Sequence, residues 1–187
     1  MKDLQYIQVA DTNMLSMYFN DGRLYELYDL CFNTAPYFED LKGNDVCKMF
    51  EEYLKNGILY LCLDDEKTVG FIATMPLLCK KDVYEVVKEH LVDASKYWYH
   101  ADIGTHPQYR RMGIAKILFQ TMLAKIPSSH IVMRTHEKNE ASISLHSGFG
   151  FKRLTLADGT PIIQDVHQLR KAGHIEPDRR IFLIYEK

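Results

Sequence analysis

Apolar residues in the first third of the chain have the spacing of one strand and two helices. Residues 4–9 alternate loosely between apolar and polar side chains, as a strand does. A helix follows, predicted by apolar residues at i, i+3, i+4 and i+7: Leu24, Leu27, Tyr28 and Cys31, with Asn20 or Asp21 as its cap. A second helix is predicted between Gly43 and Gly57, where Asn56-Gly57 ends it as a C-terminal cap.

The middle of the chain begins with two continuous apolar runs, 58–63 and 69–75. The polar residues 64–67 between them are typical of a hairpin turn. Continuous apolar character predicts strands that are covered on both faces. Residues 80–94 then have helical spacing, with Asp82 as the expected N-cap. This helix is a candidate wall of an acceptor site. Alternatively, it is an additional helix that only packs against the rest of the fold.

The central stretch of the chain is predicted as a strand, a turn, a small-residue loop and a helix. The strand covers 97–105, the turn 106–109, and the helix opens near Arg110 and ends before Pro127. The remaining pattern predicts strands at 131–135, 151–154 and 181–185, a helix at 139–146 capped by Asn139, and a helix at 161–171 closed by Gly173.

The start of the central helix has the chemistry of an anion site. The first turn of a helix has backbone N–H groups without partners and carries about half a positive charge. A pyrophosphate can therefore be held there by the main chain alone. Gly113 and Ala115 carry little or no side chain, so phosphates could approach the backbone closely. The alternative is an ordinary strand-to-helix turn with a basic N-terminus.

Composition narrows the classes of function. A length of 187 residues and an apolar fraction of 47% fit one soluble domain, 1–187. The net charge of −2 argues against a general nucleic-acid binder. The four cysteines are well separated and no apolar run could span a bilayer, so we expect a cytoplasmic protein with free thiols and no membrane partner. The eight histidines lack ligand spacing, and no metal site is expected.

Two motifs resemble the GNAT superfamily of acyl-CoA N-acyltransferases. The first is Arg110-x-x-Gly113-x-Ala115, which follows the strand end Ile103-Gly104-Thr105. It matches neither G-x-G-x-x-G nor G-x-x-x-x-G-K-[ST], so the dinucleotide and P-loop interpretations lose their support. The second motif has Asn139 before a short helix, then Ser142, Leu145-His146 and Gly150-Phe151. The resemblance covers roughly residues 58–151 and the last strand.

This resemblance implies a fold, a co-substrate and a set of binding residues. The fold is α/β (mixed α+β), with a central mixed twisted sheet of about seven strands flanked by helices and splayed at strands 4 and 5. Acetyl-CoA is the implied co-substrate. The implied binding residues are Ile103, Gly104, Thr105, Arg110, Arg111, Met112, Gly113, Ile114, Ala115, Lys116, Asn139, Ser142 and His146.

The implied reaction is transfer of an acetyl group to a primary amine by direct attack in a ternary complex. Many family members have Tyr where this chain has His146, positioned to protonate the departing sulfur. His146 is a candidate acid and a good proton shuttle near neutral pH, or else a histidine packed on CoA or a strand. Asp102 is the candidate base, with His100 second; the alternative is a buried Asp102 bonded to a loop.

The acceptor and the oligomeric state stay open at this stage. A protein N-terminus, a lysine, a polyamine, an aminoglycoside and a small amino compound all fit, and the chain could be a monomer or a homodimer. Because His146 replaces the usual Tyr, a second class of function is a CoA-binding regulatory or partner-binding module with little catalysis.

Overall fold

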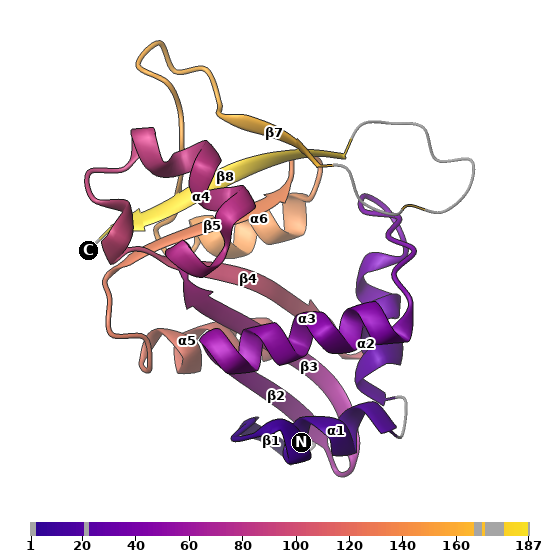
Figure 1. Cartoon of the computed structure of the whole chain (residues 1–187). Coiled ribbons are helices and arrows are strands. Elements are labelled where there is room, and N and C mark those ends of the chain that lie inside the picture. The colour runs from indigo at the N-terminus through magenta and orange to yellow at the C-terminus, as the bar shows by residue number, and fades with distance from the viewer. Residues whose placement is uncertain (1–2, 21–22, 167–169, 171–177, 187) are drawn as a thin grey trace. The chain divides into compact units, whose positions relative to one another are not determined.

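The chain divides into two units. The computed structural model describes residues 3–20, 23–166, 170 and 178–186 (Figure 1). Unit 1 consists of Met1–Thr74, Asp102–Lys125 and Leu169–Lys171, and unit 2 of Met75–Ala101, Ile126–Gln168 and Ala172–Lys187. The strands β3 (Lys67–Pro76) and β4 (Trp98–Thr105) contain residues of both units.

The strands form a mixed sheet, in agreement with the predicted α/β class. Their hydrogen-bonded order is β1-β2-β3-β4-β5-β8-β6, and β7 pairs with β8, which gives eight strands among the described residues where about seven were expected. The predicted fourth and fifth strands, β4 and β5 (His130–His136), are parallel. Their register pairs Trp98, Tyr99 and His100 with Ile131, Val132 and Met133, whereas β4 continues to Thr105 and β5 to His136.

Unit 1 is built on an antiparallel meander with helices on both faces (Figure 1). β1 (Leu4–Gln8) pairs with β2 (Ile58–Asp64), and β2 pairs with β3. The helices of this unit are α1 (Thr12–Asn20), α2 (Arg23–Phe32), α3 (Gly43–Asn56) and α5 (Ile114–Leu123). β2 and β3 are buried along almost their whole length, as continuous apolar strands predict.

Two packing contacts fix the helices of unit 1 to β3. On one face, a Cβ atom at Gly70 would lie 2.8 Å from Cγ2 of Ile114, the first residue of α5. On the other face, the Phe71 ring lies 5.1 Å from the ring of Phe50 in α3. Only glycine at position 70 leaves room for α5 at this distance, because atoms of a packed core cannot overlap.

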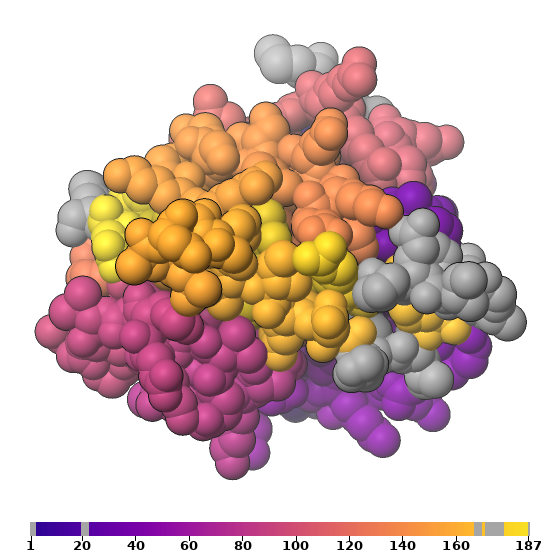
Figure 2. All heavy atoms as spheres, turned by 90° about the horizontal axis from the view of Figure 1, so that it is seen from above, coloured from indigo at the N-terminus to yellow at the C-terminus, as the bar shows by residue number. Residues whose placement is uncertain are grey.

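Unit 2 contains the remaining strands, arranged around β8 (Asp178–Glu186). β5, β6 (Lys152–Arg153) and β7 (Ile163–Val166) all pair with β8 in antiparallel fashion. Its helices are α4 (Lys81–Val87) and α6 (Glu140–Ser147), and 3₁₀ turns cover Leu77–Cys79, Lys88–His90 and Ala94–Lys96. Segments with α4 and β7 lie side by side on the surface of this unit. They are coloured magenta and gold in Figure 2.

Several predicted elements need correction. Residues 163–166 form β7 rather than a helix, because β8 pairs with them and leaves alternate side chains exposed. The rest of the expected 161–171 helix, and Gly173, lie largely outside the described residues. The helix expected over 80–94 ends at Val87. Asp82 does not cap it: Lys80 is at the N-cap position, and the Asp82 carboxylate accepts a hydrogen bond from Arg134 instead.

Helix α1 was missed by the pattern of apolar residues. Its sequence signal is Asp11, whose carboxylate accepts a hydrogen bond from the Met14 N–H at 2.8 Å, as a capping aspartate does. The predicted end of α3 is confirmed: the Gly57 N–H donates to the Tyr53 carbonyl at 2.9 Å. Asn139 caps α6 as predicted, with its side chain accepting from the Ser142 N–H at 3.1 Å.

Candidate active site

The loop between β4 and α5 leaves the main chain at the start of the helix exposed. Arg111 and Gly113 both have positive φ, 64° and 82°, and Gly113 occupies the N-cap of α5. A Cβ atom at Gly113 would meet no atom within 4 Å, so glycine is favoured here by backbone conformation rather than by lack of space. The first intrahelical bond runs from the Ile117 N–H to the Gly113 carbonyl at 3.0 Å.

The N–H groups that precede this first bond are available to a ligand. Within the described part of the chain, no group accepts a hydrogen bond from the N–H of Ile114, Ala115 or Lys116. These donors point along the helix axis, at the positive end of its dipole. Arg110 to Gly113 are exposed, so an anion could reach the donors without displacing a side chain from the core.

The turn that precedes the loop is anchored to the β2–β3 hairpin. The His106 N–H donates to the Val69 carbonyl at 2.9 Å. The buried Tyr109 donates its hydroxyl to the Asp64 carboxylate, and the Lys67 ammonium lies 5.7 Å from the centre of the Tyr109 ring. Burial lowers the pKa of His106, and the charges of nearby cations add to the effect. The surroundings of the loop are therefore electropositive.

The end of β4 contains the other candidate binding residues associated with the first motif. Gly104 is packed against Phe71: a Cβ atom there would lie 2.4 Å from the Phe71 ring and 3.1 Å from the Cys31 sulfur. The Thr105 hydroxyl oxygen is buried and, among the described residues, has no hydrogen-bond partner. The Thr105 carbonyl accepts from Arg110 Nε at 3.5 Å.

Cys31 lies beside this strand end but has the properties of a packed thiol. Its sulfur lies 3.6 Å from the Thr105 carbonyl oxygen. Burial raises the pKa of Cys31 to about 11, although Arg110 opposes that rise. A thiol with this pKa is almost wholly protonated at neutral pH and is a poor nucleophile.

Asp102 is held by a tyrosine from a different helix. The Tyr53 hydroxyl, in the last turns of α3, donates to the Asp102 carboxylate. The alternative expected from the sequence was a buried Asp102 bonded to a loop; the structure instead shows a helical side chain as a partner of Asp102. A hydroxyl donor stabilises the ionised carboxylate, which is the form that accepts a proton.

Helix α6 presents the second motif within unit 2. The Ser142 N–H is occupied by the Asn139 cap, and the Ser142 carbonyl lies 2.7 Å from Nδ1 of His146. Because a carbonyl can only accept, Nδ1 of His146 carries the hydrogen, and in the neutral ring Nε2 is then the proton acceptor. The His146 ring is fully buried, 5.0 Å from the ring of His100 and 5.3 Å from that of Phe151.

The predicted site residues thus fall into two groups, each assembled within one unit. Unit 1 contains Asp102 and the loop and helix residues from Ile103 to Lys116, and unit 2 contains Asn139, Ser142 and His146. Neither group has the composition of a metal centre: the described residues contain no cluster of three His, Cys, Asp or Glu that could bind a metal ion. Among the described residues, no helix has the length and hydrophobicity needed to cross a membrane.

The sequence profile of the acetyltransferase (GNAT) family matches residues 22–151. The chain belongs to this family. The match includes both groups of candidate residues and the helices α2 and α3, which the sequence motifs alone did not assign.

Solved structures with the same fold include other acetyltransferases. An acetyltransferase from Streptococcus agalactiae is 20% identical, with a TM-score of 0.64 and full coverage of both chains, 100% and 100%. A putative acetyltransferase from Salmonella typhimurium, solved with its cofactor acetyl-CoA, is 13% identical at a TM-score of 0.62 and covers 98% of this chain and 93% of its own. The diaminobutyrate acetyltransferase EctA from Paenibacillus lautus, solved with L-2,4-diaminobutyric acid and coenzyme A, is 15% identical at a TM-score of 0.60, with 99% and 96% coverage. No curated protein matches the chain by sequence.

Two positions that shape the candidate site of this GNAT chain were not found from its sequence. Tyr53 lies in the helix predicted between Gly43 and Gly57, and its hydroxyl contact with Asp102 gave no sequence signal. Gly70 was recognised only as part of the third strand, although it determines how closely α5 approaches β3. A glycine inside a continuous apolar strand is the signal that could have revealed the second position, because such a glycine often marks close backbone approach.

The buried His146 predicts a pH-dependent stability. Burial lowers the pKa of His146 from 6.5 to about 4, although the Ser142 carbonyl opposes the shift. Between these two values the unfolded chain binds more protons than the folded one, so the free energy of unfolding rises with pH. The contribution of His146 is complete above pH 6.5 and is lost as the pH falls to 4, by about 3 kcal/mol at most.

Urea unfolding between pH 4 and pH 7 measures this contribution. The His146→Gln variant is expected to lose the part of the pH slope that His146 contributes, whatever its stability at pH 7. His106→Gln is the matched control, because His106 lies near the surface and its pKa shift is smaller. An unchanged slope in His146→Gln would show that His146 is not buried in its neutral form.

Proposed function

We propose that this chain is an acetyl-CoA-dependent N-acetyltransferase, acting as a single domain over 1–187, which transfers an acetyl group to a primary amine. The observation that carries the proposal is the set of open N–H groups at the start of α5, after a loop with two residues of positive φ. In a member of the GNAT family, this arrangement suits the pyrophosphate of coenzyme A.

The binding of acetyl-CoA is assigned to residues of both motifs. We infer that the main chain from Arg111 to Lys116 binds the pyrophosphate, with Arg110 adding positive charge. The buried hydroxyl of Thr105, at the end of β4, is available to bind the pantetheine arm. Asn139 and Ser142 are assigned to the rest of that arm, as the family motif implies.

The chemistry requires a neutral amine, a polarised carbonyl and a proton for the leaving sulfur. Bound acetyl-CoA supplies the activated acetyl thioester. Backbone N–H groups from Ile103 to Thr105 polarise its carbonyl oxygen; one such donor contributes about 3 kcal/mol in comparable sites. As the C–N bond forms and the C–S bond breaks, the amine must lose a proton and the thiolate must gain one.

Two side chains are assigned to these proton transfers. Asp102 accepts the proton of the incoming ammonium, directly or through water, and the Tyr53 hydroxyl keeps its carboxylate ionised. His146 in the tautomer described above has a lone pair on Nε2 and no acidic proton there. We therefore assign it the part of a shuttle rather than that of a resting acid: Nε2 takes the second proton, which the attacking nitrogen loses as the C–N bond forms, and then gives it to the sulfur as the C–S bond breaks.

Turnover with a panel of amines tests the reaction directly. We expect release of free thiol from acetyl-CoA that depends on at least one amine among an amino acid, a polyamine, an aminoglycoside and peptides with a free N-terminus or lysine. Thiol release is measured with a colorimetric thiol reagent and the acetylated amine by mass spectrometry. Acetyl-CoA binding without amine-dependent release would instead support a binding module.

The Gly113→Glu variant tests the pyrophosphate cradle. A carboxylate at this open position would occupy the anion site, so the affinity for CoA measured by calorimetry should fall at least about 100-fold, as expected from the loss of charge-assisted bonds. Gly159→Glu is a matched control, because Gly159 also has a positive φ, 86°, with no atom within 4 Å of its Cβ position. It should bear the same backbone strain and retain CoA affinity. Equal affinity of the two variants for CoA would contradict the assignment of the pyrophosphate to the start of α5.

The Asp102→Asn variant tests the proposed base. It should lower kcat by about 10²–10⁴-fold, the usual contribution of general base catalysis, while the affinity for acetyl-CoA stays the same. Tyr53→Phe should keep most of the activity but shift the acidic limb of the kcat/KM profile to higher pH, because the carboxylate loses a hydrogen bond. A full-rate Asp102→Asn enzyme would exclude Asp102 as the base.

A further inference from the structure

The turn that joins β5 to α6 is built around a buried histidine of unit 2. His136 is the last residue of β5 and is 3% exposed. Its Nδ1 accepts a hydrogen bond from the Lys138 N–H at 3.1 Å, and its carbonyl accepts one from the Asn139 N–H at 2.9 Å. One residue thus holds two successive main-chain donors directly before α6, whose cap is Asn139.

The bond to Lys138 determines where the His136 ring carries its hydrogen. Because a main-chain N–H can only donate, Nδ1 of His136 bears a lone pair, and the neutral ring has its hydrogen on Nε2. Nε2 lies 4.0 Å from Oδ1 of Asp178, a buried carboxylate on β8. The negative charge of Asp178 favours a hydrogen on the nitrogen that faces it, so it selects the tautomer that leaves Nδ1 open to the turn.

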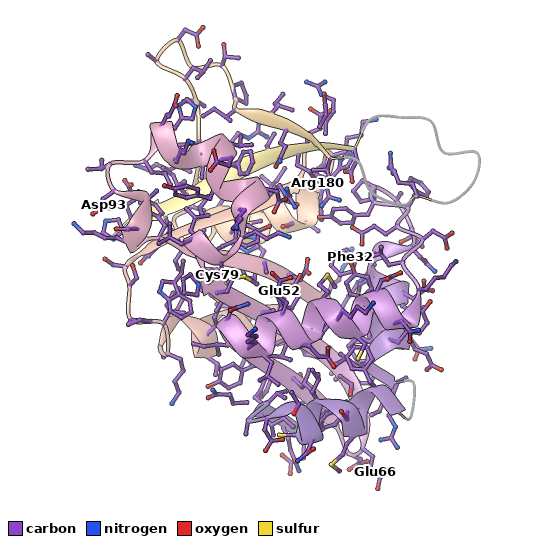
Figure 3. All side chains as sticks on the ribbon, in the orientation of Figure 1. Phe32, Glu52, Glu66, Cys79, Asp93 and Arg180 are labelled. Carbon is purple, nitrogen blue, oxygen red and sulfur yellow. The ribbon has the colours of Figure 1, made fainter. Side chains whose placement is uncertain are left out.

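The charges beside His136 balance one another. Nε and Nη2 of Arg180, labelled in Figure 3, each donate at 2.6 Å to a different oxygen of Asp178. Arg180 pairs with His136 across β5 and β8, and Asp178 lies two positions away on the same face of β8. A neutral His136 adds no charge to this buried ion pair, so the arrangement avoids the cost of a further buried charge.

Unit 1 contains the same kind of turn after β4. His106 follows the last residue of that strand, and its Nδ1 accepts from the Gln108 N–H at 3.3 Å. Burial and nearby cations lower the pKa of His106, which favours its neutral ring. An acceptor for the N–H two residues on is what Asn and Asp provide in Asx turns. In each unit, a histidine with this bond therefore stands shortly before one of the two motifs.

We propose that His136 is a positioning residue of the candidate CoA site, which acts through the turn at 137–139. The neutral ring holds the Lys138 N–H, the turn places Asn139, and the Asn139 cap orients the Ser142 N–H. Asn139 and Ser142 are the residues assigned above to the pantetheine arm, so this inference rests on the proposed function. Asparagine could replace His136 because its side-chain oxygen can accept the same bond. Glutamine could not, since its amide lies one bond farther from the main chain.

Asparagine and glutamine variants of the full-length protein test this role by calorimetry. His136→Asn should keep the wild-type affinity for CoA, whereas His136→Gln should lower it about 5–10-fold, as the loss of one hydrogen bond predicts. The nucleotide half of CoA, 3′-phospho-ADP, should bind all variants equally, because its pyrophosphate is assigned to the start of α5 in unit 1. His130→Gln, at the other end of β5, is the matched control and should bind CoA as the wild type does.

Nitrogen NMR of the protein without ligand tests the tautomer separately. His136 should show an unprotonated Nδ1 and a protonated Nε2, the reverse of His146, and its signals are identified by their loss in His136→Asn. A protonated Nδ1 on His136, equal CoA affinity of the Asn and Gln variants, or a parallel loss of 3′-phospho-ADP affinity in His136→Gln would overturn the assignment. Failure of the wild type to bind CoA, with this tautomer present, would instead overturn the proposed function.

Discussion

The close contact of α5 with β3 is the constraint on which the candidate CoA site depends. Ile114 is both the first residue of α5 and the side chain that lies over Gly70. Any side chain at position 70 would push the start of the helix away from the strand. The open N–H groups would move with it, because they belong to the same turn. A packing requirement inside the core thus determines where an anion can be bound at the surface.

The loop before α5 is fixed from its other side as well. His106 and Tyr109 tie it to the β2–β3 hairpin through a main-chain bond and a hydroxyl–carboxylate bond. Its two residues of positive φ then turn the chain into the helix. A site held in this way loses little conformational entropy when a ligand binds, which is how preorganised sites gain affinity.

Several polar side chains inside the two units have a partner that restricts what they can do. The Ser142 carbonyl selects the tautomer of His146, and Tyr53 favours the ionised form of Asp102. Asp178 pairs with Nε and Nη2 of Arg180, and Asp82 and Gln164 both accept from Nη1 of Arg134.

The sequence by itself determined the elements whose signals are local. Continuous apolar runs predicted β2 and β3, the Asn139 cap predicted α6, and the spacing Arg110-x-x-Gly113-x-Ala115 predicted the loop and helix of the candidate CoA site. Only the tertiary structure decided that 163–166 is a strand, that Asp82 pairs with Arg134 rather than capping a helix, and that Asp102 is held by Tyr53. The β7–β8 pairing joins residues 12 to 18 positions apart, and the Asp102 and Asp82 contacts join residues 49 and 52 positions apart, which a short-range pattern does not record.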